Sequence, residues 1–197
     1  MARQRLHVAV IFGSVRDGRF GSTAGNWFVA QARERDDLVV DVVDLAEVVL
    51  PMTMPAFGRQ PAPEAVDALA HLTPRLAAAD AFVVVTPEYN HSFPAALKNA
   101  IDWHHQQWQA KPVGFVSYGG MSGGLRAVEA LRLVFAELHA VTIRDTVSFH
   151  NAWRQFDADG TPVRPDECNG AAKTMLDQLS WWAHALRDAK ANSPYVA

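Results

Sequence analysis

Hydrophobic and polar positions alternate in blocks along the chain, and the blocks predict strands separated by helices. Short runs rich in Val, Ile, Leu and Phe have the length of buried strands. The expected strands are residues 6–12, 38–45, 82–86, 113–117 and 141–149. Longer stretches with an apolar residue at every third or fourth position predict helices. The expected helices are residues 22–35, 64–78, 92–104, 125–138 and 171–189, with a break or kink near Pro74.

Residues 82–103 show the change from strand to helix most clearly. The apolar run stops at Thr86, a short polar loop follows, and Ser92 is a good N-cap for the helix. Pro94 is tolerated in a first helical turn because its missing N–H would have no partner there. The loop at 87–91 therefore follows a buried strand, and in open parallel sheets ligands bind at that edge.

Prolines interrupt the connection between the second strand and the second helix. They are Pro51, Pro55, Pro61 and Pro63, and the same connection carries Met52, Met54 and Phe57. No helix can run through such a segment.

Five strands that alternate with helices imply right-handed crossovers and a parallel sheet. With this number of strands the common order is 2-1-3-4-5 with helices on both faces, a flavodoxin-like three-layer α/β sandwich. Its functional edge is made by the loops after the first, third and fourth strands. The last strand alternates enough between apolar and polar positions to lie at an edge of the sheet.

Length and charge narrow this picture to one domain with small partners. At 197 residues, 49% of them hydrophobic, the chain is long enough for one buried core, so we expect a single domain over residues 1–197. A formal charge of -3 disfavours nucleic acid and anionic membranes, because both require a basic face. A small molecule or a second copy of the chain is the expected partner.

Cys168 is the only cysteine, so one chain cannot form a disulfide, a CxxC redox pair or a thiolate zinc site. The first residues lead straight into a strand-like run without a cleavage-type segment. No apolar run approaches the roughly 20 residues that span a bilayer. We expect a cytoplasmic protein.

The first loop, residues 13–23, has the composition of a phosphate site. Its glycines let the backbone approach an anion, and the next helix presents unpaired N–H groups and its positive dipole end. The hydroxyls and positive charges come from Ser14, Ser22, Thr23, Arg16 and Arg19. The loop lacks a P-loop ending and a G-x-G-x-x-G motif, which disfavours ATP and a Rossmann-type NAD site. A plain Gly/Ser-rich turn is the alternative.

The third loop, residues 117–124, contains four glycines between a strand and a helix. Such a loop suits a flat ring that lies against backbone N–H groups. A flexible turn would look similar, but three loops of unusual chemistry on one sheet edge favour a binding site.

Three motifs, GSVRDGRFG, TPEYNHSFPAALKNAIDW and SYGGMSGGLRAVEALR, resemble the NADPH-dependent FMN reductase family of flavodoxin-like proteins. This family includes quinone, azo-dye and chromate reductases, and the resemblance spans roughly residues 6–150. It implies noncovalent FMN at the carboxyl edge of the sheet. By resemblance, the FMN phosphate is held by Ser14, Arg16, Arg19, Phe20 and Gly21. The isoalloxazine is bordered by Pro87, Glu88, Tyr89 and Asn90, and its other side is closed by Ser117, Tyr118, Gly119 and Gly120.

One segment departs from the family pattern. Many members have a serine and a small polar residue just after the arginine, where this chain reads Asp-Gly-Arg-Phe-Gly at positions 17–21, similar to another branch. Arg19, Ser22 and Thr23 are the candidates to replace the missing hydroxyl contact.

The resemblance implies an NAD(P)H oxidoreductase that works by ping-pong. Hydride passes from NADPH or NADH to N5 of FMN, and a small acceptor (quinone, flavin, azo compound or metal oxyanion) then takes the electrons. The protein positions the rings and offers N–H donors, so we name no catalytic residue and no metal ligand.

Two other functions are open on this fold. An FMN-binding electron carrier or redox-responsive binding protein is the main alternative, although such carriers tend to be strongly acidic. A flavin-free assembly protein is disfavoured by Arg16, Tyr89, Asn90 and the glycine pair at 119–120.

For several other residues we expect structural, interface or surface roles. Adjacent histidines on a helix point apart, so His104 and His105 are expected to be structural or at an interface rather than metal ligands. Glu88 is expected to contact the flavin or form an inter-subunit ion pair. Other expected roles are a helix surface pair for Lys98 and Asp102, solvated positions or NADPH contacts for Arg126 and Arg132, and core and edge packing for Trp181 and Trp182.

The resemblance also suggests a homodimer or homotetramer, with the helix at 92–104 at an interface. A preference for NADPH would need an arginine near its 2′-phosphate. The candidates are Arg19, Arg59 and Arg126.

Overall fold

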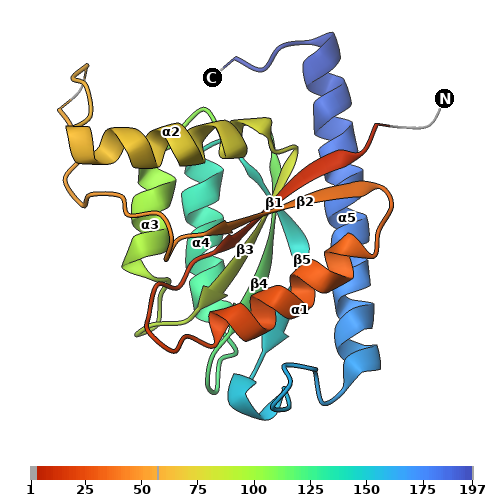
Figure 1. Ribbon diagram of the computed structural model, residues 1–197. Helices are drawn as coiled ribbons and strands as arrows, with labels where there is room; N and C mark the ends of the chain where they lie inside the picture. The colour runs from red at the N-terminus through yellow and green to blue at the C-terminus, as the bar shows by residue number, and fades with distance from the viewer. Residues whose placement is uncertain (1–3, 57, 197) are drawn as a thin grey trace.

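The computed structural model describes residues 4–56 and 58–196, and its centre is a parallel sheet of five strands (Figure 1). The strands are β1 (Leu6–Phe12), β2 (Leu38–Asp44), β3 (Ala81–Pro87), β4 (Pro112–Tyr118) and β5 (Val141–Phe149). Their order is β2-β1-β3-β4-β5, which confirms the predicted flavodoxin-like topology. Because β5 pairs only with β4 and alternates between buried and partly exposed residues, it is an edge strand, as predicted.

Helices cover both faces of the sheet (Figure 1). They are α1 (Gly21–Arg33), α2 (Pro63–Ala78), α3 (Ala95–Asp102), α4 (Leu125–Glu137) and α5 (Pro165–Asn192), with a short 3₁₀ helix, η1 (Ala152–Arg154). Helices α1 and α5 pack on one face, and α2, α3 and α4 pack on the other. No helix in the described part of the chain combines the length and apolarity needed to cross a membrane.

Alternation along the central strands builds two separate cores. In β1, Val8 and Val10 contact the α1 and α5 side, whereas Ala9 and Ile11 contact the opposite side, because successive side chains of a strand point to opposite faces. Strands β3 and β4 are buried along their whole length. The sheet is therefore covered on both faces, so a ligand would approach it at the ends of its strands.

The start of α3 differs from the prediction. The helix begins at Ala95 and Pro94 occupies the N-cap position, so Ser92 is not the N-cap. Ser92 instead exchanges backbone hydrogen bonds with Tyr89, at 2.8 and 3.0 Å, and closes a tight turn. Two reciprocal backbone bonds hold Ser92 in a bridge, which removes it from the helix.

Three further expectations need correction or qualification. Helix α2 continues through Pro74 to Ala78, so the proline does not end it. Helix α5 is longer than predicted, because it begins at Pro165 and ends at Asn192. Trp182 packs against the core, but Trp181 is 64% exposed on the outer face of α5 and is not a core residue.

Phe57, in the proline-rich connection, lies outside the described residues.

Candidate functional site

The carboxyl ends of β1, β3 and β4 lie side by side and bring three predicted loops together. Phe12 is paired with Val85 in β3, and Pro87 is paired with Tyr118 at the end of β4. The Gly13 N–H donates to Val85 O at 2.9 Å directly after β1. The loops after these strands therefore leave the sheet as neighbours, as the predicted strand order requires.

Ser14 joins the first loop to the loop after β3. Its side chain is buried, and its Oγ atom shares a hydrogen bond with Tyr89 Oη at 2.7 Å. The backbone N–H of Arg16 also donates to Ser14 Oγ, at 3.4 Å. Two residues that sequence reasoning assigned to different ends of the flavin are thus in direct contact.

The two arginines of the first loop differ in their surroundings. Arg19 folds inward, where its guanidinium donates to Ser14 O at 2.6 Å and forms an ion pair with Asp44 at the end of β2. Arg16 is exposed, and its guanidinium has no hydrogen-bond or ion-pair partner among residues 4–56 and 58–196. Arg16 is therefore the uncommitted positive charge of this loop. The sequence analysis did not identify Asp44 as the partner of Arg19. An acidic residue at the end of the predicted second strand, next to the first loop, could have indicated this ion pair.

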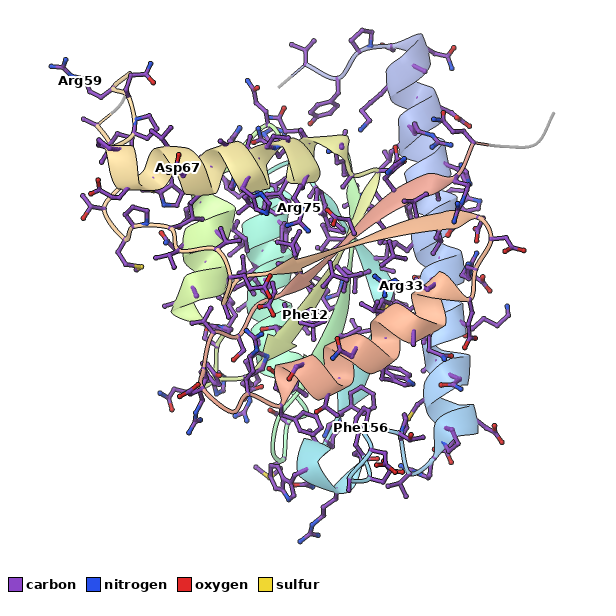
Figure 2. The ribbon with its side chains drawn as sticks, viewed as in Figure 1. Phe12, Arg33, Arg59, Asp67, Arg75 and Phe156 are labelled. Atoms are coloured by element: carbon purple, nitrogen blue, oxygen red, sulfur yellow. The ribbon has the colours of Figure 1, made fainter. Side chains whose placement is uncertain are left out.

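Helix α1 begins within this loop and leaves its first N–H groups available. Phe20 occupies the N-cap position, and its side chain makes no capping hydrogen bond. Ser22 Oγ donates backwards to Arg19 O at 3.1 Å. The Phe20 ring packs against the rings of Tyr118 and Phe156, at centroid distances of 5.7 and 5.4 Å, and Figure 2 shows Phe156 near the start of α1. The aromatic contacts hold the first turn of α1 in place while its donors stay free.

The Tyr118 hydroxyl packs against Gly21 in the first turn of α1. A Cβ atom at Gly21 would lie 2.4 Å from Tyr118 Oη, so any other residue would require the tyrosine side chain to shift. The Tyr118 side chain is 6% exposed, and its hydroxyl has no hydrogen-bond partner among the described residues. Burial raises the pKa of this phenol well above its ordinary value.

The glycine-rich loop after β4 is held by hydrogen bonds to its backbone. The buried Ser117 Oγ donates to Gly123 O at 2.9 Å, so this side chain stabilises the loop. The N–H groups of Ala152 and Asn151 donate to the carbonyls of residues 119 and 120, at 3.1 and 2.8 Å respectively. Of the residues that the structure describes, a Cβ atom at Gly120 would meet Trp153 alone, at 3.7 Å from Cη2. The backbone at this glycine therefore presents an open surface.

Trp153 is a second residue that sequence reasoning missed. Its indole is 63% exposed although it belongs to η1, which the hydrogen bonds described above anchor to the glycine-rich loop. A tryptophan a few residues after the predicted last strand is the sequence signal that could have identified it.

Glu88 is bound within its own chain. Its side chain is 7% exposed, and Oε1 pairs with Arg126 Nε at 2.7 Å. Oε2 accepts hydrogen bonds from Ser122 Oγ at 2.6 Å and from the Arg126 N–H at 3.1 Å. Burial alone would raise the pKa of Glu88, but these donors and the charge of Arg126 outweigh it and hold the pKa below its ordinary value. Glu88 thus joins the loop after β3 to the start of α4.

The remaining predicted residues lie around this centre or away from it. Asn90 is exposed in the turn closed by Tyr89 and Ser92, with a left-handed φ of 48°. Arg126 also contacts His91, at 3.0 Å between Nη1 and Nδ1, so it is not a free solvated residue. Figure 2 shows Arg59 at the outer end of the connection before α2, away from the three loops.

The two histidines predicted in the helix at 92–104 and just after it both follow α3, which ends at Asp102, and they have structural surroundings. His104 is buried, with Nδ1 2.8 Å from Ala100 O and Nε2 3.0 Å from Thr73 Oγ1, whereas His105 is exposed. Among the described residues, no three His, Cys, Asp or Glu side chains are grouped as metal ligands.

Two charged groups on helices also have assigned partners. The predicted surface pair is present, since Lys98 Nζ lies 2.7 and 2.8 Å from the carboxylate oxygens of Asp102. Arg132 donates to the carbonyls of Ile143 and Arg144 in β5, at 2.7 and 3.0 Å, so it supports the sheet edge.

Comparison with known proteins identifies relatives that match nearly the whole chain. The chain is 33% identical over 205 residues to a probable NADPH:quinone oxidoreductase 2 of Oryza sativa subsp. japonica, covering 98% of this chain and 96% of the relative. It is 29% identical over 193 residues to an FMN-dependent NADPH-azoreductase of Staphylococcus haemolyticus, covering 94% and 96%.

A solved structure shows the same fold. The flavoenzyme FerB, an NAD(P)H:(acceptor) oxidoreductase from Paracoccus denitrificans, superposes with a TM-score of 0.69 over 90% of this chain and 97% of its own, at 21% identity. The family described as NADPH-dependent FMN reductase matches residues 6–154, a range that contains the whole sheet and the three loops. The chain therefore belongs to the NADPH-dependent FMN reductase family and is an oxidoreductase.

Proposed function

We propose that the protein binds FMN noncovalently at the carboxyl edge of the sheet and transfers hydride from NADPH or NADH, through the flavin, to a small acceptor in a ping-pong cycle. The observation that carries this proposal is the meeting of three loops at one edge, with the uncapped start of α1 at its centre.

The first loop fits the phosphate of FMN. Helix α1 offers N–H groups and the positive end of its dipole, and both favour an anion. Arg16 adds a guanidinium that has no partner in the described part of the chain, whereas Arg19 is committed to Asp44. Arg16 is therefore the proposed charged phosphate ligand from this loop. Ser14 and Ser22 are the proposed hydroxyl ligands, and to bind they would turn from their present bonds to Tyr89 Oη and Arg19 O. Arg19 and Phe20 hold the shape of the loop. Thr23, the third candidate for the missing hydroxyl contact, begins the helical bonding, since its N–H donates to Phe20 O at 3.0 Å.

The loops after β3 and β4 fit a flat ring. Residues 119 and 120 present backbone, and the nearest neighbour to a Cβ at Gly120 is 3.7 Å away. On the other loop, Tyr89 and Asn90 form a turn fixed by two backbone bonds. We propose that these two segments border the isoalloxazine, while Glu88 and Ser117 hold the loops in position from behind.

When bound, FMN supplies the group that accepts hydride from a nicotinamide and passes the electrons on. The chain's own task is to bind and orient the rings and to direct backbone N–H groups at them. No described side chain is needed as a proton donor, and we assign no catalytic residue.

We propose quinones as the first acceptors to test, and azo compounds, free flavin and metal oxyanions as the next. The support is that relatives matching nearly the whole chain are named a probable quinone oxidoreductase and an azoreductase. The single cysteine supports a cytoplasmic location, which is also a proposal.

We further propose a homodimer or homotetramer with α3 at the interface. The segment before α2 is tied to α3, because Asn99 Nδ2 and Trp103 Nε1 donate to Pro51 O at 3.2 and 3.0 Å. Beside it, Val49 and Met52 are 80% and 72% exposed, which gives α3 an apolar border that a second copy would cover. Light scattering on the purified protein would test this, and a monomeric mass would contradict it.

The proposed activity is tested by anaerobic addition of NADPH, and separately NADH, to protein reconstituted with FMN. Bleaching of the yellow absorption, followed by its return on addition of a quinone, is the expected result. Persistent yellow colour would favour the electron-carrier alternative. Failure to bind FMN would exclude both.

A further inference from the structure

The hydroxyl of Tyr118 is an unpaired polar group in a buried position. Tyr118 is the last residue of β4, it is 6% exposed, and its Oη atom has no hydrogen-bond partner among the described residues. Buried hydroxyls are almost always paired, because leaving one unpaired in a protein interior is unfavourable. A phenylalanine would fill the same space without the free-energy cost of an unpaired hydroxyl. We therefore expect the hydroxyl to have a hydrogen-bond partner that binds from outside the chain.

The hydroxyl points at the start of α1. A Cβ atom at Gly21, the first residue of that helix, would lie 2.4 Å from Oη and 3.3 Å from Cζ. The ring is fixed from the side by Phe20, at a centroid distance of 5.7 Å. Oη therefore lies against the same helical turn whose N-cap residue, Phe20, makes no side-chain capping bond.

The neighbouring polar groups are already engaged. Ser14 Oγ is bonded to Tyr89 Oη at 2.7 Å, and the Arg19 guanidinium is bonded to Ser14 O and Asp44. Ser14 is close enough to favour the ionised phenol slightly, but it does not form a hydrogen bond with Tyr118. Burial is the stronger effect and keeps the phenol protonated, so Tyr118 offers a donor that lacks an acceptor.

We propose that Tyr118 is a phosphate-recognition residue, whose hydroxyl donates to the phosphate of FMN at the start of α1 and so distinguishes FMN from riboflavin. This inference rests on the proposed function, because it requires FMN to bind at this edge. The Tyr118 hydroxyl would be a hydrogen-bond donor from β4, on the side of the phosphate that faces the sheet. Gly21 would leave the space that this hydroxyl occupies.

The test is the Tyr118→Phe variant, which removes only the hydroxyl. Dissociation constants for FMN and for riboflavin are measured by quenching of flavin fluorescence. We expect the affinity for FMN to fall about 10-fold or more, as for loss of a hydrogen bond to a charged group, and the affinity for riboflavin to stay unchanged. Tyr195→Phe is the matched control, since its hydroxyl bonds to His139 at 2.7 Å on an exposed part of the chain, and both affinities should be unaffected.

Gly21→Ala gives a second, independent test. Its Cβ would displace the Tyr118 hydroxyl, so it should weaken FMN binding in the wild-type background and weaken it much less in the Tyr118→Phe background. Equal loss of FMN and riboflavin affinity in Tyr118→Phe, or no loss of either, would overturn the inference. The proposed function would still stand if the wild type bound FMN. A wild-type protein that binds neither flavin would overturn both.

Discussion

Glu88 Oε1 accepts a charge-assisted hydrogen bond from Arg126 Nε at 2.7 Å, and this contact joins the loop after β3 to the first turn of α4. The two segments are 38 positions apart in the sequence. Ser122 completes the arrangement from the glycine-rich loop, at 2.6 Å from Glu88 Oε2. The loops proposed to border the flavin are therefore held against each other before any ligand binds, which is a form of preorganisation.

Arg126→Ala should lower the free energy of unfolding by about 1 kcal/mol, since Glu88 stays buried without its charged partner while the 43% exposure of Arg126 screens the pair. Urea unfolding at neutral pH measures the change. Arg144→Ala is the control, because Arg144 is 91% exposed in its pair with Asp145 and should have almost no effect. Equal stability of the two variants would show that the Glu88 pair contributes nothing.

Glu88→Gln should reduce the loss of stability in acid. The folded pKa of Glu88 lies below its ordinary value of 4.5, so its contribution is present above that pH and is lost as the pH falls through the lower, folded value. The wild type should therefore lose more of its unfolding free energy between pH 6 and 3 than the variant does. Glu129→Gln, at a 77% exposed carboxylate, should behave like the wild type. Identical pH profiles for wild type and Glu88→Gln would refute the assignment.

His104→Gln should remove a different pH dependence. Burial lowers the pKa of His104 from 6.5, and the hydrogen bond to Ala100 O opposes this only in part. Because the unfolded chain binds the proton more tightly, stability is complete above pH 6.5 and falls as the pH decreases through the folded pKa. Urea midpoints at pH 7.5 and 5.5 should differ less in the variant than in the wild type. The exposed neighbour His105→Gln should keep the wild-type difference, and a change there would implicate exposed histidines instead.

Arg16→Ala should weaken FMN binding about 10-fold and leave riboflavin binding unchanged, because the exposed guanidinium is proposed to contact the phosphate. Fluorescence titration with the two flavins measures this. Arg59→Ala is the matched control, at an exposed arginine away from the loops (Figure 2), and should bind both flavins normally. If Arg16→Ala and Arg59→Ala lost the same amount of FMN affinity, the effect would come from the net charge of the protein and not from a contact between Arg16 and the phosphate.

Gly124→Ala should destabilise the protein by about 2 kcal/mol or more, because its φ of 86° is strained for alanine and a Cβ would lie 2.7 Å from Ser117 Cβ. Gly170→Ala is the contrasting control. It lies in α5 with open space around it, and alanine should stabilise the helix by about 0.5–1 kcal/mol. Thermal unfolding of both variants gives the comparison, and a Gly124→Ala protein of wild-type stability would contradict the proposed loop geometry.

Much of the fold could be predicted because its signals are local. The buried run of β3 and the alternation in β5 each reflect one stretch of sequence, and the strand order follows from the number and spacing of such stretches. Ser92 shows the limit of this reasoning. Its side chain is a good helix cap, but backbone pairing with Tyr89 places it outside α3. That competition is decided by the conformation of the whole turn.

Residue types and motif spacing by themselves determined the sheet, its carboxyl edge, the three loops that gather there and the family resemblance. The tertiary structure alone decided which groups at that edge are already engaged. It pairs Arg19 with Asp44 and Glu88 with Arg126, leaves Arg16 without a partner among the described residues, and directs the Tyr118 hydroxyl at Gly21. The physical reason is that hydrophobic periodicity is a property of neighbours in sequence, whereas the partner of a charge or a hydroxyl is set by the packing of distant segments.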